Sequence, residues 1–214
     1  MTWVLGNLNM IGGLIVEHLY FALPPVVLGL LLAIPLGWLA NRTATGRTIV
    51  INVAGLLYTV PSLALFVILP AILGTGILNP VNVIVALTVY TVALLVRTVA
   101  DALSAVPGMV IDSATAMGYR PLRRFVSVEL PLSVPVVLAG LRVAAVSSIS
   151  LVTVGSVIGF GGLGKMFTDG FQRDIPQEII AGIVLVLVIA LVVDGLLILA
   201  GRALTPWLAA RGAR

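Results

Sequence analysis

A glycine-rich stretch that begins at Gly159 and ends at Lys165 has the residue types that bind phosphates in nucleotide-binding proteins. Gly159, Gly161 and Gly164 follow the spacing of the dinucleotide fingerprint, and the whole stretch follows most of a Walker A motif. A Walker A loop needs Ser or Thr after its Lys to hold magnesium, and Met166 stands there instead. Both motifs also follow a β-strand, whereas the segment before Gly159 has the composition of a membrane helix. We therefore expect a tight turn that binds no nucleotide. The chain then has no ATP-binding site of its own, so the energy for any ATP-driven process would have to come from another subunit.

Thiol and histidine chemistry is largely excluded by composition. The 214-residue chain has no Cys and a single His, His18. Disulfides, thiolate sites and multi-histidine metal sites are therefore excluded, and we predict no metal and no cofactor. We expect His18 to be an interfacial residue near the start of the first membrane span.

Two charged residues, Arg142 and Asp194, lie inside long apolar segments. A charge inside a membrane is costly and normally faces a partner or a cavity. At 1.5 Å per helical residue, Arg142 lies roughly 12 Å and Asp194 roughly 9 Å from the same side of the membrane. The similar depths predict an ion pair between two helices. The alternative is that one of these charges lines a transport pathway.

Two groups of polar residues are candidates for the lining of such a pathway. One group recurs at three-residue intervals on a single helix face and consists of Ser147, Ser150 and Thr153. The other surrounds a proline that frees a backbone carbonyl and consists of Thr59, Pro61 and Ser62. Hydroxyls in membrane helices most often bond their own backbone or a neighbouring helix, and membrane prolines are often tolerated kinks. For each group, this structural role and a role in lining the route of a small polar solute therefore both remain open.

The elements that must position these residues are membrane helices. The chain is 60% hydrophobic and 9% charged, whereas ordinary globular domains carry about 25% charged residues. A helix crosses the hydrocarbon with about 20 apolar residues. We therefore predict a single all-α, polytopic membrane domain with about five spans, near residues 19–40, 48–68, 81–99, 134–158 and 179–200. Residues 68–78 are apolar but broken by proline and glycine, and they form a short re-entrant segment, the ragged end of the second span, or a sixth span.

The distribution of Lys and Arg predicts the orientation, because cytoplasmic loops carry an excess of both. With five spans, one side receives nine basic residues: Arg42, Arg47, Arg97, Arg120, Arg123, Arg124, Arg202, Arg211 and Arg214. The other side receives only Lys165 and Arg173. We therefore expect an external N-terminus and a cytoplasmic C-terminus. A sixth span would divide the basic residues between the two sides, so we favour five.

A polar segment at about residues 101–131 lies on the cytoplasmic side in this arrangement and has a helix-turn-helix pattern. Gly118 is suited to the left-handed conformation that ends a helix, and Pro121 to the first turn of the next. The second short helix carries apolar residues at spacings of three and four. Such a helix can lie on the lipid surface or merely connect two spans.

The same segment resembles the EAA motif of ABC-importer permeases, which is Glu-Ala-Ala, three residues, Gly, nine residues, an aliphatic residue, any residue, and Leu-Pro. Ala114, Gly118, Leu130 and Pro131 match this pattern with all spacings intact. Asp112 replaces Glu and keeps the carboxylate, while Ser113 replaces Ala. The resemblance implies a coupling helix that docks into an ATPase subunit. It assigns ATPase coupling to Asp112, Ser113, Ala114, Gly118, Arg120, Pro121, Phe125, Leu130 and Pro131.

The resemblance extends over about residues 19–199, and other stretches look like the osmoprotectant branch of these permeases. These stretches are 58–65 (Tyr-Thr-Val-Pro-Ser-Leu-Ala-Leu), 132–135 (Leu-Ser-Val-Pro), 139–142 (Ala-Gly-Leu-Arg) and 161–164 (Gly-Gly-Leu-Gly). That branch transports glycine betaine, carnitine, choline or proline betaine. Methionine-importer permeases share the five-span plan and are the alternative within the family.

The resemblance implies a bacterial inner-membrane permease that contains no ATPase of its own. Its expected partners are a second permease subunit, a cytoplasmic ABC ATPase dimer, an extracytoplasmic solute-binding protein and the lipid bilayer, with no nucleic acid. Two alternatives belong to other classes. A membrane scaffold would need no coupling loop, and a proton-coupled carrier would need a titratable residue in its pathway, for which Asp194 is the candidate.

Overall fold

The computed structural model describes residues 2–209, and within that range it contains helices and no β-strand, which confirms the all-α prediction. The long helices are α2 (Leu8–Ala40), α3 (Ala44–Thr59), α5 (Pro80–Ser104), α8 (Leu130–Gly155) and α10 (Pro176–Leu204). The shorter helices are α1 (Thr2–Gly6), α4 (Ser62–Leu73), α6 (Gly108–Ala116), α7 (Pro121–Arg124), α9 (Lys165–Gln172) and α11 (Pro206–Ala209). A π-helical turn, Phe125–Glu129, precedes α8, and a 3-10 turn, Ser156–Ile158, follows it.

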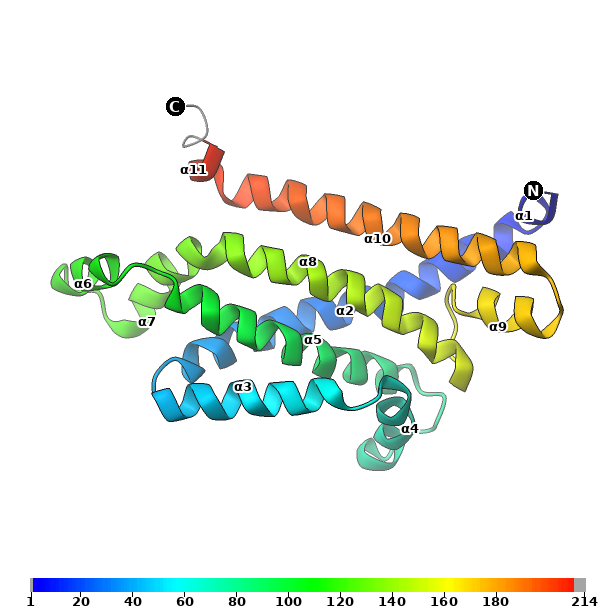
Figure 1. The fold of residues 1–214 in the computed structure, drawn as a ribbon, viewed down its shortest axis with the longest axis horizontal. Coiled ribbons are helices and arrows are strands. Elements are labelled where there is room, and N and C mark those ends of the chain that lie inside the picture. The colour runs from blue at the N-terminus through cyan, green and yellow to red at the C-terminus, as the bar shows by residue number, and fades with distance from the viewer. Residues whose placement is uncertain (1, 210–214) are drawn as a thin grey trace.

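The molecule is an elongated bundle with a short helical tip at one end (Figure 1). Helix α5 packs against α2, α3 and α8, and α10 lies along α8 on the side away from α3. Helices α6 and α7 form the tip, and α11 lies at that same end. Helices α1 and α9 lie at the opposite end. Arg211 and Arg214, which entered the charge count, lie outside the described residues.

The described residues contain four helical runs that are long and apolar enough to cross a membrane, and the bent pair α3–α4 makes up to five. The C-terminal ends of α2 and α5 lie at the same end of the bundle, where Asn41 donates a hydrogen bond to the Ala100 carbonyl (2.8 Å). Arg47 also donates to the Ser104 hydroxyl (2.5 Å) and pairs with Asp101. The loop after α2 and the tip after α5 therefore share one end, as five spans require.

Small residues bring α2 and α5 close together. Gly29 packs so closely against Thr91 that an added Cβ would lie 2.3 Å from a methyl of that threonine. Two turns further on, a Cβ at Gly37 would lie 2.7 Å from Val99. Membrane helices associate through such close contacts because lipid supplies no hydrophobic drive for their pairing.

The first membrane helix begins earlier than predicted and changes the interpretation of His18. Helix α2 starts at Leu8, whereas the predicted span started at residue 19. His18 therefore lies about three turns into the helix and is completely buried. His18 is thus not near the start of its helix, as was expected, and its ring is held between α8 and the glycine-rich loop.

The predicted span at residues 48–68 is not one helix. It is broken at Val60 and Pro61, and α3 and α4 are bent by 102°. Proline restricts the residue before it to extended conformations, and Val60 has ψ 129°. Residues 68–78, whose nature the sequence left open, form the end of α4 and an irregular return to α5 that starts at Gly74.

The other spans lie close to their predicted positions but are longer. Helix α5 extends the predicted 81–99 to Ser104, and α10 extends the predicted 179–200 in both directions. The predicted polar segment at 101–131 is correspondingly shorter, because Asp101 is still in α5, and Leu130 and Pro131 begin α8. Helical backbone thus continues beyond the apolar stretch that signalled each span.

Candidate functional site

The first candidate site is the tip formed by α6 and α7. As predicted, Gly118 ends the first short helix in the left-handed conformation, with φ 84°. Its N–H bonds the Thr115 carbonyl (2.9 Å), and the next N–H, of Tyr119, bonds the Ala114 carbonyl (3.1 Å). These bonds satisfy two carbonyls that a helix end leaves free. The chain then turns into α7, whose first residue is Pro121.

Arg124 ties this tip to the bundle. Its Nη1 donates to the Thr115 hydroxyl on α6 (2.8 Å), and its Nε donates to a carboxylate oxygen of Glu129 (2.6 Å). Glu129 is only 8% exposed, so Arg124 supplies a partner for a carboxylate that is largely removed from water. Arg124 therefore links α6 to the π-helical turn that leads into α8.

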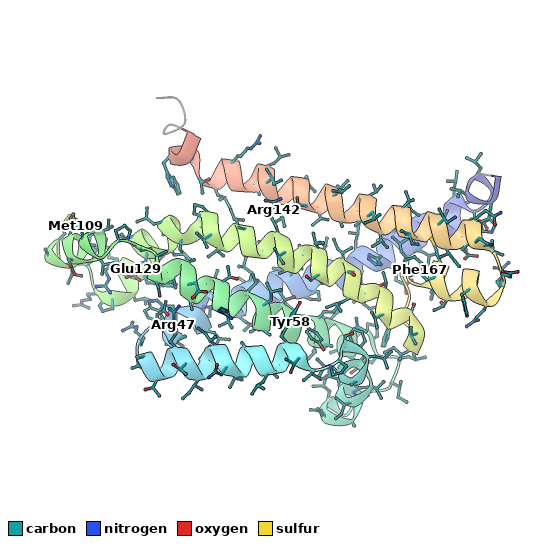
Figure 2. All side chains as sticks on the ribbon, in the orientation of Figure 1. Arg47, Tyr58, Met109, Glu129, Arg142 and Phe167 are labelled. Atoms are coloured by element: carbon teal, nitrogen blue, oxygen red, sulfur yellow. The ribbon has the colours of Figure 1, made fainter. Side chains whose placement is uncertain are left out.

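Phe125 is an anchor inside the bundle rather than an exposed residue of the tip. It is buried, and its ring lies 4.9 Å from the ring of Trp38 on α2. The guanidinium of Arg42 covers the indole of Trp38 at 4.1 Å. This stack fixes the base of the tip on the end of α2. Figure 2 shows the tip beyond Glu129, with Met109 near its extremity.

The outer surface of the tip combines polar groups with flexible apolar side chains. Asp112 is exposed, and the Ser113 hydroxyl is used within α6, where it donates to the Met109 carbonyl (2.7 Å). Ala114 faces inward and is buried. The most exposed apolar side chains here are Met109 (80%), Met117 (71%) and Leu122 (62%). Arg120 and Pro121, the N-cap and first residue of α7, are also exposed.

The second candidate site is a pair of partly exposed charges between α8 and α10. Arg142 on α8 and Asp194 on α10 meet in a bidentate pair, with Nε to Oδ1 at 2.6 Å and Nη2 to Oδ2 at 2.8 Å. The fork of a guanidinium matches a carboxylate in this geometry. The structure thus brings together the two charges that the sequence placed at similar depth, and the contact joins α10 to α8.

The third candidate site lies at the break between α3 and α4. Tyr90 on α5 donates its hydroxyl to the Val60 carbonyl, which the break leaves without a helical partner. The Thr59 hydroxyl bonds its own helix at Leu56 (2.7 Å). Thr59 and Pro61 are exposed, and Ser62 is half-buried at the start of α4. The break therefore ends α3, and the backbone carbonyl that it frees is still hydrogen-bonded.

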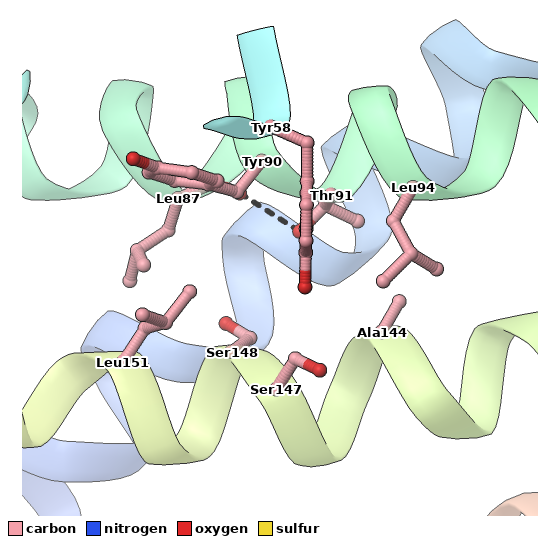
Figure 3. A pocket seen from close by; sticks show the side chains of 9 residues that line it. All are labelled: Tyr58, Leu87, Tyr90, Thr91, Leu94, Ala144, Ser147, Ser148 and Leu151. Atoms are coloured by element: carbon pink, nitrogen blue, oxygen red, sulfur yellow. Dashed lines mark hydrogen bonds between the residues drawn. The ribbon is translucent and has the colours of Figure 1, made fainter. Parts of the chain in front are cut away.

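A small cavity lies beside this break, between α5 and α8 (Figure 3). Its volume of about 10 Å³ has room for about one water. Its surface is mostly apolar, and the residues around it that carry hydroxyl groups are Tyr58, Tyr90, Thr91, Ser147 and Ser148. Figure 3 shows Tyr58 reaching from α3 into the space between the two helices, with its hydroxyl directed toward α8.

Only one member of the predicted hydroxyl stripe lines this cavity. That member is Ser147, whereas Ser150 is exposed and the Thr153 hydroxyl bonds its own helix at the Ser150 carbonyl (2.6 Å). Tyr58 and Tyr90 line the cavity but were not predicted from the sequence as site residues. The sequence could have indicated these two tyrosines only through their neighbours. Tyr58 directly precedes the Thr-Val-Pro stretch, and Tyr90 lies among the threonines of the next span.

The fourth feature is the glycine-rich loop at the end opposite the tip. Glu17 accepts a hydrogen bond from the Gly162 N–H (2.9 Å), and His18 Nδ1 accepts one from the Leu163 N–H (3.3 Å). His18 Nε2 lies 3.1 Å from the Ile149 carbonyl and therefore carries the proton. A Cβ at Gly161 would lie 1.8 Å from the Glu17 carboxylate. The loop is thus a turn that two α2 side chains hold, and its glycines serve packing.

No metal centre is formed by the described residues, since residues 2–209 contain no group of three or more His, Asp or Glu that could hold an ion. The glycine-rich loop also follows a helix and a 3-10 turn in place of the strand that both phosphate-binding motifs require.

Comparison with known proteins places these features in a family context. Residues 19–208 match the family described as binding-protein-dependent transport system inner membrane component. The chain is 36% identical over 190 residues to the choline transport system permease protein OpuBB of Bacillus subtilis, covering 89% of this chain and 86% of that protein. It is 35% identical, with the same coverage, to the glycine betaine/carnitine/choline transport system permease protein OpuCB of Bacillus subtilis. It is 31% identical to the osmoprotectant import permease protein OsmW of Salmonella typhimurium, covering 95% and 96% of the two chains.

A solved structure supports the architecture. The chain resembles a chain of the MetNI methionine ABC transporter in an inward-facing conformation, with a TM-score of 0.79 and 22% identity. The similarity covers 92% of this chain and 97% of that one. At this identity the likeness concerns the fold.

Proposed function

The chain belongs to the family of binding-protein-dependent transport system inner membrane components, and from this premise we propose that it forms the pathway of an ABC importer for a quaternary-ammonium osmoprotectant. It is a transport subunit, and the ATP is hydrolysed by a partner. The observation that carries the cargo assignment is identity of 35–36% to permeases named for choline, glycine betaine and carnitine, over 89% of the chain.

The tip formed by α6 and α7 is proposed as the coupling element. Its surface offers the carboxylate of Asp112 and two exposed methionines, Met109 and Met117, to a partner. Methionine side chains are flexible and polarizable and suit an interface that shifts during a cycle. Arg124 and Phe125 connect the tip to α8 and α2, so a push on α6 reaches the membrane helices.

The proposed assembly contains two permease subunits, two cytoplasmic ATPases and an external solute-binding protein. The second permease is either another copy of this chain or a similar subunit. The tip lies in the cytoplasm and the α9 end outside, because most basic residues gather at the tip end. The N-terminus is then external and the C-terminus cytoplasmic in a bacterial inner membrane.

Alternating access between the two sides is the proposed mechanism. Closure of the ATPases on ATP moves α6, and α8 and α5 carry the movement to the cavity beside the α3–α4 break. Thr59, Pro61 and Ser62 shape that break, and Ser147 lines its cavity, with Ser150 and Thr153 further along α8. The glycine-rich loop held by Glu17 is proposed as part of the outer closure.

Two alternatives are weaker. The likeness to the methionine transporter is one of fold at 22% identity, so it does not carry a methionine cargo to this chain. A proton-coupled carrier would need Asp194 free to bind a proton, but the bidentate contact with Arg142 occupies both carboxylate oxygens.

The coupling role is tested by copurification of the chain with the ATPase subunit of its transporter. Gly118→Val should break the left-handed helix end, and Asp112→Lys should reverse the charge on the outer face, so both should release the ATPase. Gly76→Val is the matched control, since that glycine has open space around it and lies at the other end of the bundle. Retention of the ATPase by both tip variants would contradict the coupling role.

A further inference from the structure

Tyr58 separates two spaces beside the α3–α4 break. One is the cavity of about 10 Å³ between α5 and α8, and the other is an open crevice of about 280 Å³ between α3 and α5. Tyr58 and Leu94 line both. The crevice is close to the lower end of the usual range for small-molecule sites, about 300–1,000 Å³. A rotation of the half-exposed Tyr58 ring would join the two spaces.

The crevice also contains a cation, Arg97. On α5, Tyr90, Leu94 and Arg97 are spaced by four and three residues, so they lie along one helix face over roughly 10 Å. The Arg97 side chain is 70% exposed, and its Nε lies 3.8 Å from an oxygen of Asp101. That carboxylate is already engaged by Arg47. Two guanidinium groups thus share one carboxylate, which leaves Arg97 with donors for another anion.

The aromatic rings provide the complementary chemistry. The rings of Tyr58 and Tyr90 meet edge to face, with centroids 5.9 Å apart. Tyr90 is fixed by the hydrogen bond that its hydroxyl donates to the Val60 carbonyl at the α3–α4 break. Tyr58 is 47% exposed. The face of a tyrosine ring attracts a quaternary ammonium group. Neither space is lined by an acidic residue, so such a cation would be held by the rings.

We propose that Tyr58 and Arg97 form a solute subsite in the pathway that selects betaine-type zwitterions over simple quaternary-ammonium cations. The proposal rests on the proposed transport function and adds the ligand chemistry of this site. The trimethylammonium group lies against Tyr58, and the carboxylate is bound by the Arg97 fork. Glycine betaine and carnitine carry both groups. Choline carries a hydroxyl in place of the carboxylate, so Arg97 repels it without a compensating contact.

The test is uptake by the full transporter, with its own ATPase and binding protein, in proteoliposomes that contain ATP. Uptake of labelled glycine betaine and choline is measured with the binding protein saturated, so that its own preference cancels between variants. Arg97→Gln should lower the ratio of glycine betaine to choline uptake by about tenfold, as loss of a charged hydrogen bond implies. Arg202→Gln is the matched control, because it removes the same charge at the same end but outside the crevice.

The aromatic half of the subsite has its own variants. Tyr58→Leu should lower uptake of both solutes by about fivefold, while Tyr58→Phe keeps the ring and should retain both. If Arg97→Gln does not assemble, Arg97→Lys serves in its place, and loss of the fork should still lower the ratio severalfold.

Three outcomes would overturn the subsite. They are an Arg97 variant with the wild-type ratio, an Arg97 variant that loses both solutes in equal proportion, and a Tyr58→Leu variant with wild-type uptake. Failure of the proposed function looks different, since the wild-type transporter would then accumulate neither solute.

Discussion

Replacement of Arg124 by Met would remove one of the two side-chain links between the tip and the bundle, and leave the Phe125 stack on Trp38 in place. The Arg124 guanidinium donates to the Thr115 hydroxyl at 2.8 Å and to Glu129 at 2.6 Å. In the variant, α6 loses its attachment to α8, and the carboxylate of Glu129 stays buried without a partner. The variant should therefore be less stable and should hydrolyse more ATP for each solute molecule imported.

The expected magnitude follows from the burial of the two partners. Removing one partner of a fully buried ion pair costs about 3–5 kcal/mol. The Arg124 side chain is 25% exposed and that of Glu129 10%, so water screens part of this cost and we expect about 2 kcal/mol. The double variant Arg124→Met, Glu129→Met leaves no unpaired charge and should lie within about 1 kcal/mol of the wild type. It should remain uncoupled, because the contact with Thr115 is still absent.

Two assays compare the single variant, the double variant and the wild type. The free energy of unfolding is measured by denaturant titration in mixed micelles, and coupling is measured as ATP hydrolysed per solute imported in proteoliposomes. Arg123→Met is the control, since that exposed arginine only covers the Tyr119 ring at 5.0 Å and should cost less than about 1 kcal/mol. A double variant as unstable as the single one, or a single variant with wild-type coupling, would refute the reasoning.

Three further predictions concern the membrane helices. Arg142→Glu and Asp194→Arg should each reduce the yield of folded protein, and the double variant should recover it, because the contact is bidentate; no recovery would contradict the pair. Gly164→Ala should lower the free energy of unfolding by about 2 kcal/mol, because its Cβ would lie 2.5 Å from the backbone carbonyl oxygen of Thr153; a wild-type value would contradict the close contact. Tyr90→Phe should cost about 1 kcal/mol of unfolding free energy through loss of its hydroxyl hydrogen bond, and an unchanged value would exclude that bond.

The sequence was informative where a single strong physical constraint acts. Long apolar runs are typical of membrane helices, so four of the five predicted spans correspond to single long helices, although their ends were misplaced by up to about three turns. Arg142 and Asp194 are costly charges at similar depth, and the structure brings them together. Gly118 stands where a helix must end, and it takes the predicted left-handed φ.

Features that depend on contacts between distant segments were missed. The burial of His18 depends on Leu163 and Ile149, which are more than 130 residues away. Hydropathy also could not separate a kink at Pro61 from a 102° break, because the break depends on the Tyr90 hydroxyl that satisfies the freed carbonyl. The pairing of Tyr58 with Tyr90 follows from that break and was missed for the same reason.

The central claim is that ATP hydrolysis on a partner drives solute through this chain. It is tested most directly by accumulation of labelled glycine betaine in proteoliposomes that contain the chain, its ATPase and its binding protein. Accumulation should require enclosed ATP and should persist when a protonophore collapses the proton gradient. Accumulation driven by an imposed proton gradient in vesicles that lack the ATPase would contradict the account.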